Sequence, residues 1–173
     1  MELMETINSR RSIRKYLDKP VEPDKIEAVL KAGQLAHSAS NRQEWRFVVV
    51  TQPETREKIA EIAGQPFVGE AGAIIVACGI GTHRMRCGLE CMPIDVAIAL
   101  THMTFKAVEE GLGTCWIGSF DADKIKELLH IPDEAVVVEL MPIGYPASSP
   151  QPKPRKSLEE IRCFEKWGFG ISK

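Results

Sequence analysis

The stretch PIDVAIALTHMTFKAVEEGL, residues 93–112, is apolar almost all the way round when it is drawn as a helix. A surface helix is apolar on one face, so this pattern predicts a helix buried in the core. The run AIIVAC, residues 73–78, lies between two glycines and predicts a strand that is covered on both faces. Together the two segments predict a core made of layers, with at least one central helix and one central strand.

The segments on either side alternate between helical and strand patterns. Strands are predicted at residues 46–51, 114–119 and 136–140. Further helices are predicted near the N-terminus, over residues 23–36, from Pro53, and after Asp121, which can cap a helix. A chain of 173 residues is too short for two independent cores. The fold class that follows is α/β or α+β, in a single domain over residues 1–145.

Residues 146–173 have a different character. Four prolines between positions 146 and 154 exclude a helix or a central strand and predict an extended segment. The apolar side chains that follow need a surface to cover them; they are Leu158, Ile161, Phe164, Trp167 and Phe169. We therefore expect residues 146–173 to form an arm that packs on a partner subunit, in a homodimer with exchanged arms.

Composition narrows the class of protein. Hydrophobic residues make up 44% and charged residues 27% of the chain, and the formal charge is -2. This charge provides no overall positive field for nucleic acid, and we find no run of about 20 apolar residues to span a membrane. The N-terminus does not resemble a signal peptide, and the five cysteines are scattered and odd in number. We expect a cytoplasmic protein with reduced thiols that binds neither nucleic acid nor membrane.

Three motifs could form a binding site. RRSIR at residues 10–14 offers guanidinium groups and a hydroxyl to a phosphate monoester, or it is a solvated basic turn. SASNRQEWRF at 38–47 offers polar groups to a heterocycle, or it is a helix C-cap with a core tryptophan. GLGTCWIGS at 111–119 lets the backbone approach a flat ligand, or its glycines mark turns. The spacing of these glycines is not that of a dinucleotide-binding or P-loop fingerprint.

A metal site is a further hypothesis. His83, Cys87 and Cys91 have the spacing that would place three zinc ligands on one helical face. Glycines at 79, 81 and 88 make this stretch a poor helix, and no fourth ligand or C-x-x-C pair is present. The reading that we favour is therefore thiols and an imidazole in a loop, without a metal. His102, inside the apolar helix, is expected to be a core histidine.

The motifs, taken in order, resemble the nitroreductase family of FMN-dependent oxidoreductases. The resemblance runs from about Glu5 to Arg155 through R-R-S-I-R, A-x-S-A-x-N-x-Q-x-W-R-F, Asp95, G-L-G-T-C-W-I-G and I-G-Y-P. It implies a mixed β-sheet flanked by helices, in an intertwined homodimer with FMN at the interface and exchanged C-terminal arms. The sequence departs from the family pattern at His37 and Glu44, and residues 82–92 do not match it. This unmatched segment is expected where the family covers the substrate.

The resemblance also assigns residues to the cofactor. It implies that the FMN phosphate and ribityl chain are held by Arg10, Arg11 and Ser12, with Lys153 or Arg155 completing the phosphate site.

Around the flavin ring, Arg14 is implied near the N1/O2 edge. Ser38 and Asn41 would approach the ring from the other subunit. Ile117 and the backbone of Gly118 would lie near N5, where the chemistry takes place.

The implied reaction transfers hydride from NADH or NADPH to flavin N5 and then to an acceptor in the same pocket, which gives ping-pong kinetics. Nitroaromatics, quinones and free flavin are the expected acceptors. Two alternatives remain: a specialised flavoenzyme of the same fold, for dehalogenation or flavin cleavage, and a non-catalytic flavin-binding protein.

Overall fold

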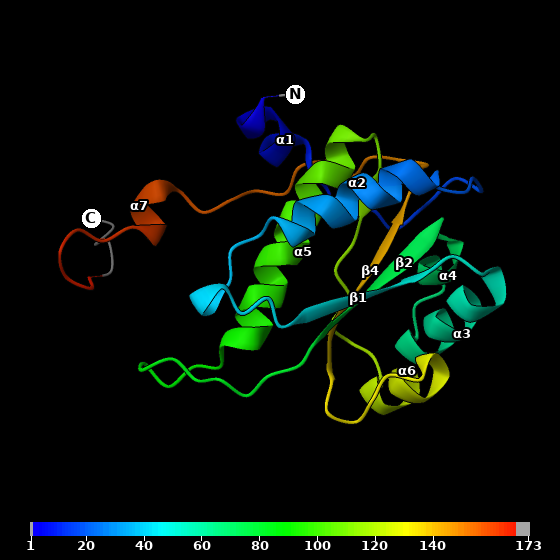
Figure 1. Ribbon diagram of the computed structural model, residues 1–173. Helices are drawn as coiled ribbons and strands as arrows, with labels where there is room; N and C mark the ends of the chain where they lie inside the picture. The colour runs from blue at the N-terminus through cyan, green and yellow to red at the C-terminus, as the bar shows by residue number, and fades with distance from the viewer. Residues whose placement is uncertain (1, 169–173) are drawn as a thin grey trace.

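The computed structural model describes residues 2–168 and has a four-stranded sheet at its centre (Figure 1). The strand order is β1-β2-β4-β3, with bounds β1 Trp45–Val50, β2 Ala73–Gly79, β3 Gly113–Thr114 and β4 Val136–Gly144. Every residue of β2 is buried and the strand lies between β1 and β4. The central strand predicted from the apolar run at 73–78 is therefore confirmed.

The neighbouring strands of the sheet pair in antiparallel fashion. Trp45 lies opposite Gly79 in the β1–β2 pair, and Ala73 lies opposite Ile143 in the β2–β4 pair. A parallel bridge between Ser12 and Thr114 adds the N-terminal segment beside β3, which makes the sheet mixed. Residues far apart in the sequence thus meet at one edge of the sheet.

The strand predicted at residues 114–119 is wrong in its extent. Only Gly113–Thr114 forms a strand, followed by a separate bridge between Ile117 and Leu140. Cys115 N–H donates to the Pro142 carbonyl oxygen at 3.3 Å, but Pro142 has no N–H with which to return the bond. The ladder is interrupted at this proline, a feature of the partner strand that the glycine-rich segment does not reveal by itself.

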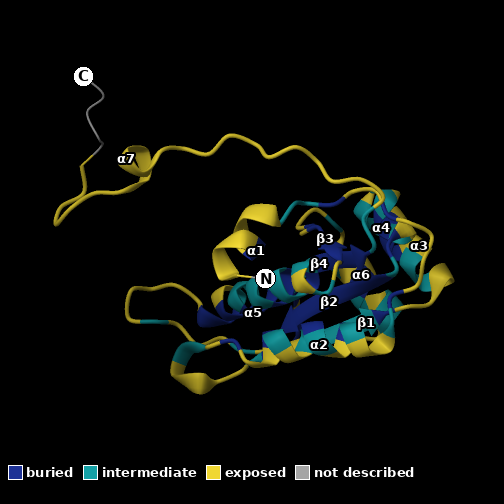
Figure 2. Ribbon diagram, turned by 90° about the horizontal axis from the view of Figure 1, so that it is seen from above, coloured by how far each residue is buried: buried dark blue, intermediate teal, exposed yellow. Residues whose placement is uncertain are grey.

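Helices cover both faces of the sheet (Figure 2). Along β2 the side chains alternate, so Ile75 packs with α2 and α5, whereas Ile74 and Val76 pack with α3, α4 and α6. The bounds are α2 Pro23–Gln34 and α5 Cys91–Glu109 on one face, and α3 Pro53–Ala63, α4 Phe67–Glu70 and α6 Ala122–Leu129 on the other. The layered class and its flanking helices are those expected from the sequence, except that α4 was not predicted.

The long apolar helix is α5, and it is buried on one side only. Val96, Leu100 and Met103 are fully buried, whereas Ile94 is 40% exposed and Phe105 is half-buried. Contrary to the sequence expectation, α5 is long and apolar enough to span a membrane, but half of this stretch is buried inside the fold, as in a core helix. The prediction of a helix buried all round is therefore wrong for the single chain, because one apolar face is left open.

The N-terminal segment and the start of the C-terminal arm lie side by side, where Ala147 N–H donates to the Lys15 carbonyl oxygen at 2.9 Å. The N-terminal helix α1 (Leu3–Ser9) leads into the basic segment, and the arm runs away from the body to the short helix α7 (Leu158–Ile161) (Figures 1 and 2). Every residue from 147 to 168 is exposed, including Trp167 at 86%. The course after Tyr145 is extended as the prolines predict, while its packing on a partner stays a prediction. Phe169 lies outside the described residues.

Candidate functional site

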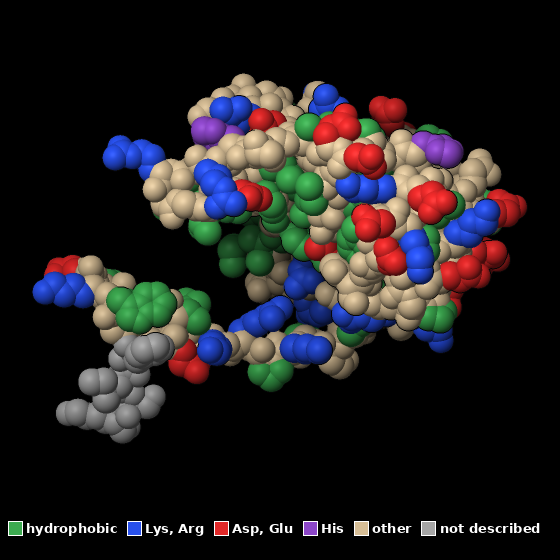
Figure 3. All heavy atoms as spheres, turned by 90° about the horizontal axis from the view of Figure 1, so that it is seen from below, with side chains coloured by type: hydrophobic (Ala, Val, Ile, Leu, Met, Phe, Trp, Pro, Cys, Tyr) green, Lys and Arg blue, Asp and Glu red, His purple; other side chains and the backbone are tan. Residues whose placement is uncertain are grey.

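A hollow of about 610 Å³ separates the N-terminal segment from the start of the arm, and we call it the basic hollow. Figure 3 shows Lys and Arg side chains gathered around a recess whose wall carries hydrophobic side chains. Five of the lining residues are cationic and none is acidic. The lining comprises Ile7, Asn8, Arg10, Arg11, Ser12, Arg14, Phe105, Pro150, Gln151, Pro152, Lys153 and Arg155.

The sheet fixes the backbone of the basic segment. Ile13 N–H donates to the Thr114 carbonyl oxygen at 2.9 Å, and the buried Ile13 side chain packs beneath the segment. The buried Tyr16 hydroxyl donates to the Ile13 carbonyl oxygen at 3.0 Å. Because Ile13 points inward, its neighbours Ser12 and Arg14 are left to face the hollow.

Arg11 has a side-chain donor at the basic hollow that lacks an acceptor. Its Nη1 donates to the carbonyl oxygens of Asn8 at 2.6 Å and Arg10 at 2.8 Å, while its Nε is buried without a partner. A buried donor without an acceptor costs free energy, and an oxyanion would supply the acceptor. Five cations without a lining carboxylate fit the phosphate of FMN and argue against the solvated-turn reading of RRSIR.

A smaller hollow of about 250 Å³, which we call the inner hollow, adjoins the basic one and shares Arg10, Ser12 and Phe105 with it. The remaining lining residues come from α5 and from the segment after β3: Thr101, Thr104, Thr114, Cys115 and Trp116. Trp116 Nε1 donates to Thr104 Oγ1 at 3.1 Å and ties this segment to α5. Burial raises the pKa of the Cys115 thiol, a shift that the positive charge of Arg14 opposes, so Cys115 is neutral at pH 7.

The glycines near β3 have different roles. A Cβ on Gly113 would overlap the Ile13 side chain, so this glycine makes room for the protein's own core and not for a ligand. Gly118 is more open: its nearest neighbours are the Glu139 carboxylate oxygens, 3.6 Å from where its Cβ would stand. Ile117 is buried and packs with Val137 on the opposite face of the sheet. Neither Ile117 nor Gly118 lines the two hollows, although both continue from the segment that does.

Ser38 and Asn41 lie away from the basic hollow of their own chain. Their loop is attached near Asp95, and Phe105 lies about 15 Å further along α5 at 1.5 Å per residue. The predicted phosphate-site residues and Arg14 thus line the basic hollow, whereas Ser38 and Asn41 do not. This is the separation that an approach from a partner would require.

Asp95 holds this loop in place, a role that the sequence did not reveal. Its side chain is 4% exposed, and its Oδ1 and Oδ2 accept from Ala39 N–H at 3.2 and 3.1 Å. The loop includes the 3₁₀ turn Ala39–Asn41, and Ser40, Asn41 and Gln43 have positive φ angles of 52°, 54° and 54°. A lone carboxylate in an otherwise apolar helix was the signal that could have identified the anchor.

The two departures from the family pattern flank this loop. Glu44 Oε1 lies 3.3 Å from Arg42 Nη1, while Glu44 Oε2 is buried without a hydrogen-bond partner. The exposed His37 faces His102 with their ring centroids 6.3 Å apart. His102 is half-buried, so its expected place in the core is met only in part.

The zinc hypothesis finds no support in residues 2–168, where no group of three or more potential ligands is close enough to hold an ion. The segment before α5 is a hairpin-like loop in which Arg84 pairs with Glu90 at 2.6 Å. His83 and Cys87 are exposed in this loop, whereas Cys91 is buried in the first turn of α5. The helical face that three ligands would need is not formed.

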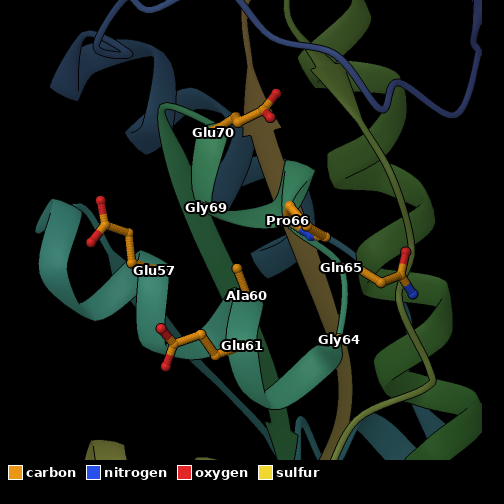
Figure 4. A pocket seen from close by; sticks show the side chains of 8 residues that line it. All are labelled: Glu57, Ala60, Glu61, Gly64, Gln65, Pro66, Gly69 and Glu70. Carbon is orange, nitrogen blue, oxygen red and sulfur yellow. The ribbon is translucent and has the colours of Figure 1, made fainter.

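Another hollow, of about 600 Å³, lies between α3 and α4 and has the opposite charge. Figure 4 shows Glu57, Glu61 and Glu70 around it, together with Gln65 and Pro66. Carboxylates would repel a phosphate. The basic hollow is therefore the candidate site for the cofactor.

Comparison with known proteins places the chain among its relatives. The model of the nitroreductase family matches residues 7–67 and 63–145. The chain belongs to the nitroreductase family. The family that the ordered motifs resemble is confirmed, and with it the enzyme class, FMN-dependent NAD(P)H oxidoreductase. The match ends at residue 145, so the arm of this nitroreductase lies beyond it.

Relatives of this nitroreductase match most of its length. A protein of Methanothermobacter thermautotrophicus, provisionally named NADH dehydrogenase/NAD(P)H nitroreductase, is 33% identical over 96% of this chain and 88% of its own. An FMN reductase (NAD(P)H) of Bacillus subtilis is 29% identical over 95% of this chain and 74% of its own. The structure of NADPH:FMN oxidoreductase from Vibrio harveyi, complexed with NAD+, has a TM-score of 0.87 and 28% identity over 95% of this chain and 77% of its own. The nitroreductase fold expected from the sequence is confirmed.

Proposed function

We propose that this nitroreductase binds FMN in the basic hollow and reduces nitroaromatic, quinone or flavin-like acceptors by a ping-pong mechanism. Bound FMN supplies a flavin N5 that takes hydride from NADH or NADPH and passes it to the acceptor. The observation that carries the proposal is the cluster of five cations, without a lining carboxylate, around an Arg11 Nε that has no partner.

The residues of the basic hollow would bind the phosphate and ribityl chain of FMN. Arg10, Arg11 and Ser12 hold the phosphate and ribityl chain, and Lys153 or Arg155 brings a further positive charge from the arm. Their guanidinium groups suit a phosphate because they offer paired N–H donors in one plane.

Other residues would contact the flavin ring of FMN. Arg14 would place a positive charge at the N1/O2 edge of the ring, while Ile117 and the Gly118 backbone would lie near N5.

The site is completed by a second copy of the chain. Ser38 and Asn41 of the partner subunit approach the ring, and the arms cross between subunits. The open apolar face of α5, with Ile94 at 40% exposure, and the exposed Trp167 of the arm support this assembly, because both apolar surfaces require a cover. The protein acts in the cytoplasm, with neither nucleic acid nor membrane as a partner.

The first experiment is the visible spectrum of the purified protein supplied with FMN, followed by anaerobic addition of NADH and then NADPH. We expect bound flavin that bleaches with a nicotinamide. Arg11→Gln should weaken FMN binding about 10- to 100-fold through loss of a charge-assisted contact, whereas Arg86→Gln, in the exposed loop before α5, should not.

Each other result has a defined meaning. Bound flavin that does not bleach would favour a specialised flavoenzyme or a flavin carrier. Equal FMN affinity in the Arg11→Gln and Arg86→Gln variants would remove the basic hollow as the phosphate site.

A further inference from the structure

The basic hollow has two walls that come from opposite ends of the chain. One wall is the N-terminal segment, which carries three arginines, and the other is the start of the arm, which carries Lys153 and Arg155. The two segments are joined where Ala147 N–H donates to the Lys15 carbonyl oxygen at 2.9 Å. From this point the arm runs along the recess that Figure 3 shows. The hollow therefore lies between a wall that belongs to the body and a wall that belongs to the arm.

Beyond Ala147 the arm has no polar contact that fixes its position. Every residue from 148 to 156 is exposed, and none of them forms a hydrogen bond or an ion pair with any other part of residues 2–168. The two walls also carry charge of the same sign, and like charges repel each other. The interactions of the chain itself therefore do not hold this part of the arm against the body.

The sequence of the same segment favours docking once a ligand is present. Three prolines alternate with Gln151, Lys153 and Arg155 over residues 150–155. Because proline fixes φ, this segment has fewer conformations to lose when it is held in place. Lys153 and Arg155 can thus be presented to one ligand at a small loss of entropy.

An oxyanion in the basic hollow would attract both walls at once. The Nε of Arg11, on the body wall, is buried without a hydrogen-bond partner, and none of the lining residues is acidic. An anion between the walls replaces their mutual repulsion with the attraction of each wall to the anion. The guanidinium groups of both walls also match the geometry of phosphate oxygens. Binding of the anion and closure of the arm are therefore coupled.

We propose that residues 148–156 form a strap, which a phosphate group closes over the basic hollow and which must open before FMN can leave. This inference deepens the proposed function and rests on it for the position of the FMN phosphate. Since coupling of this kind is reciprocal, the closed strap tightens FMN binding and bound FMN holds the strap closed. The strap thus determines how long the protein retains its flavin.

Limited proteolysis of the full-length protein tests the closure. Trypsin cleaves after Arg155 and Lys156, at the end of the strap, and cleavage after Arg84, in the exposed loop before α5, is the reference in every sample. Protein prepared without flavin is mixed with inorganic phosphate, with sodium chloride of equal ionic strength, with FMN, or with riboflavin, which lacks the phosphate. Mass spectrometry follows the rate of each cleavage.

Phosphate or FMN, at about ten times its dissociation constant, should slow cleavage after Arg155 about 10-fold, because the protease acts on the open strap. Chloride and riboflavin should leave this rate unchanged. Arg11→Gln, which changes the body wall and keeps both cleavage sites of the strap, should lose most of the protection. Arg86→Gln, in the exposed loop before α5, should keep the protection.

The rate of FMN release gives a second measurement, followed by flavin fluorescence after dilution. The double variant Lys153→Gln/Arg155→Gln should release FMN about 10-fold faster than wild type, because charge-assisted contacts from the strap are lost. Lys156→Gln is the matched control, since it removes the same charge from a neighbouring residue that does not line the hollow. Its release rate should equal that of wild type.

The outcomes separate this inference from the proposed function. If the protein binds FMN, and neither phosphate nor FMN slows cleavage after Arg155, the strap is overturned and the proposed function stands. Equal protection by riboflavin would also overturn the strap, since the phosphate would not be the group that closes it. Protection by phosphate in a protein that does not bind FMN would support the strap and remove the proposed function.

Discussion

The charged side chains of this molecule are distributed unevenly between two hollows. The basic hollow concentrates positive charge in a protein whose formal charge is -2, and the hollow between α3 and α4 concentrates negative charge. A local arrangement of this kind attracts an anion to one place without attracting polyanions over the whole surface. Arg11 is the clearest case, because its Nη1 has two backbone contacts while its Nε is buried without a hydrogen-bond partner.

Tyr145, in the I-G-Y-P motif, gives a testable pH dependence. Its hydroxyl donates to Glu22 Oε2 at 2.6 Å, and this bond, with Lys19 nearby, lowers the pKa of Glu22 from 4.5 to about 2. A lowered carboxyl pKa stabilises the fold above pH 4.5, and this stabilisation is lost as the pH falls from 4.5 towards 2. Tyr145→Phe should therefore unfold at lower urea concentration than wild type at pH 7, and the difference should shrink at pH 3.

The control for this prediction is the same substitution made in a Glu22→Gln background. There the effect of Tyr145→Phe should be independent of pH, since the carboxylate that titrates is gone. A difference from wild type that is the same at pH 7 and pH 3 would contradict the assignment to Glu22.

Groupings of residues that are neighbours in the sequence could be predicted from the sequence. Contacts between residues that are far apart in the sequence could not. Arg10, Arg11 and Ser12 are contiguous, so their grouping was visible in the sequence. The position of Glu139 beside Gly118 depends on a strand pairing across more than twenty residues, and no local pattern shows it. The space beside Gly113 is a further case, because Ile13 fills it from a hundred residues away.

At the scale of elements, α5 organises both halves of the proposed site. Near its N-terminus Asp95 fixes the loop at 38–43, and near its C-terminus Phe105 lines the basic hollow. The helix therefore sets the distance between the residues that a chain supplies to its own site and those that it offers to a partner. This arrangement predicts that loss of the Asp95 anchor weakens FMN binding at the partner's site.

Asp95 is the residue with which to test the anchoring of this loop. Asp95→Ala leaves the Ala39 N–H without an acceptor and should destabilise the protein by roughly 1–3 kcal/mol. Asp95→Asn keeps an acceptor oxygen for the Ala39 N–H, so this variant should lose less stability than Asp95→Ala. Thermal unfolding and amide hydrogen exchange at Ala39 measure the two effects. Equal destabilisation by Ala and Asn would show that the charge of Asp95, and not its contact with Ala39, is what matters.

The elements themselves were predictable to different degrees. Long segments with a clear period, such as α2, α5 and β2, begin and end within a few residues of the predicted bounds. The four-residue helix α4 has too few positions to show a period. The extent of β3 depends on Pro142 in another strand. Periodicity therefore located the elements that pack extensively and missed those that depend on neighbours.

For the whole molecule, the open face of α5 predicts the assembly. Placing a charge there with Ile94→Glu should convert a dimer into monomers, because the face could no longer be buried against a second copy. FMN binding should be weakened in the same variant, since the proposed site takes Ser38 and Asn41 from the partner. Light scattering during size-exclusion chromatography and an FMN titration measure the two outcomes.

Leu35→Glu is the control for this assembly. Leu35 is 69% exposed at the end of α2, away from the open face, and the substitution should change neither mass nor affinity. A wild-type protein that is monomeric at micromolar concentration and binds FMN fully would contradict the shared site.

The strand order β1-β2-β4-β3 has a consequence for how the protein is made. The central strand β2 emerges from the ribosome early, yet one of its two neighbours is β4, whose residues 136–144 emerge much later. During synthesis one edge of the apolar strand β2 stays unpaired until β4 has emerged. Unpaired strand edges promote the aggregation of sheet proteins. The yield of soluble protein in cells should therefore depend on chaperones that hold nascent chains during this interval, even though β2 is fully buried in the finished sheet.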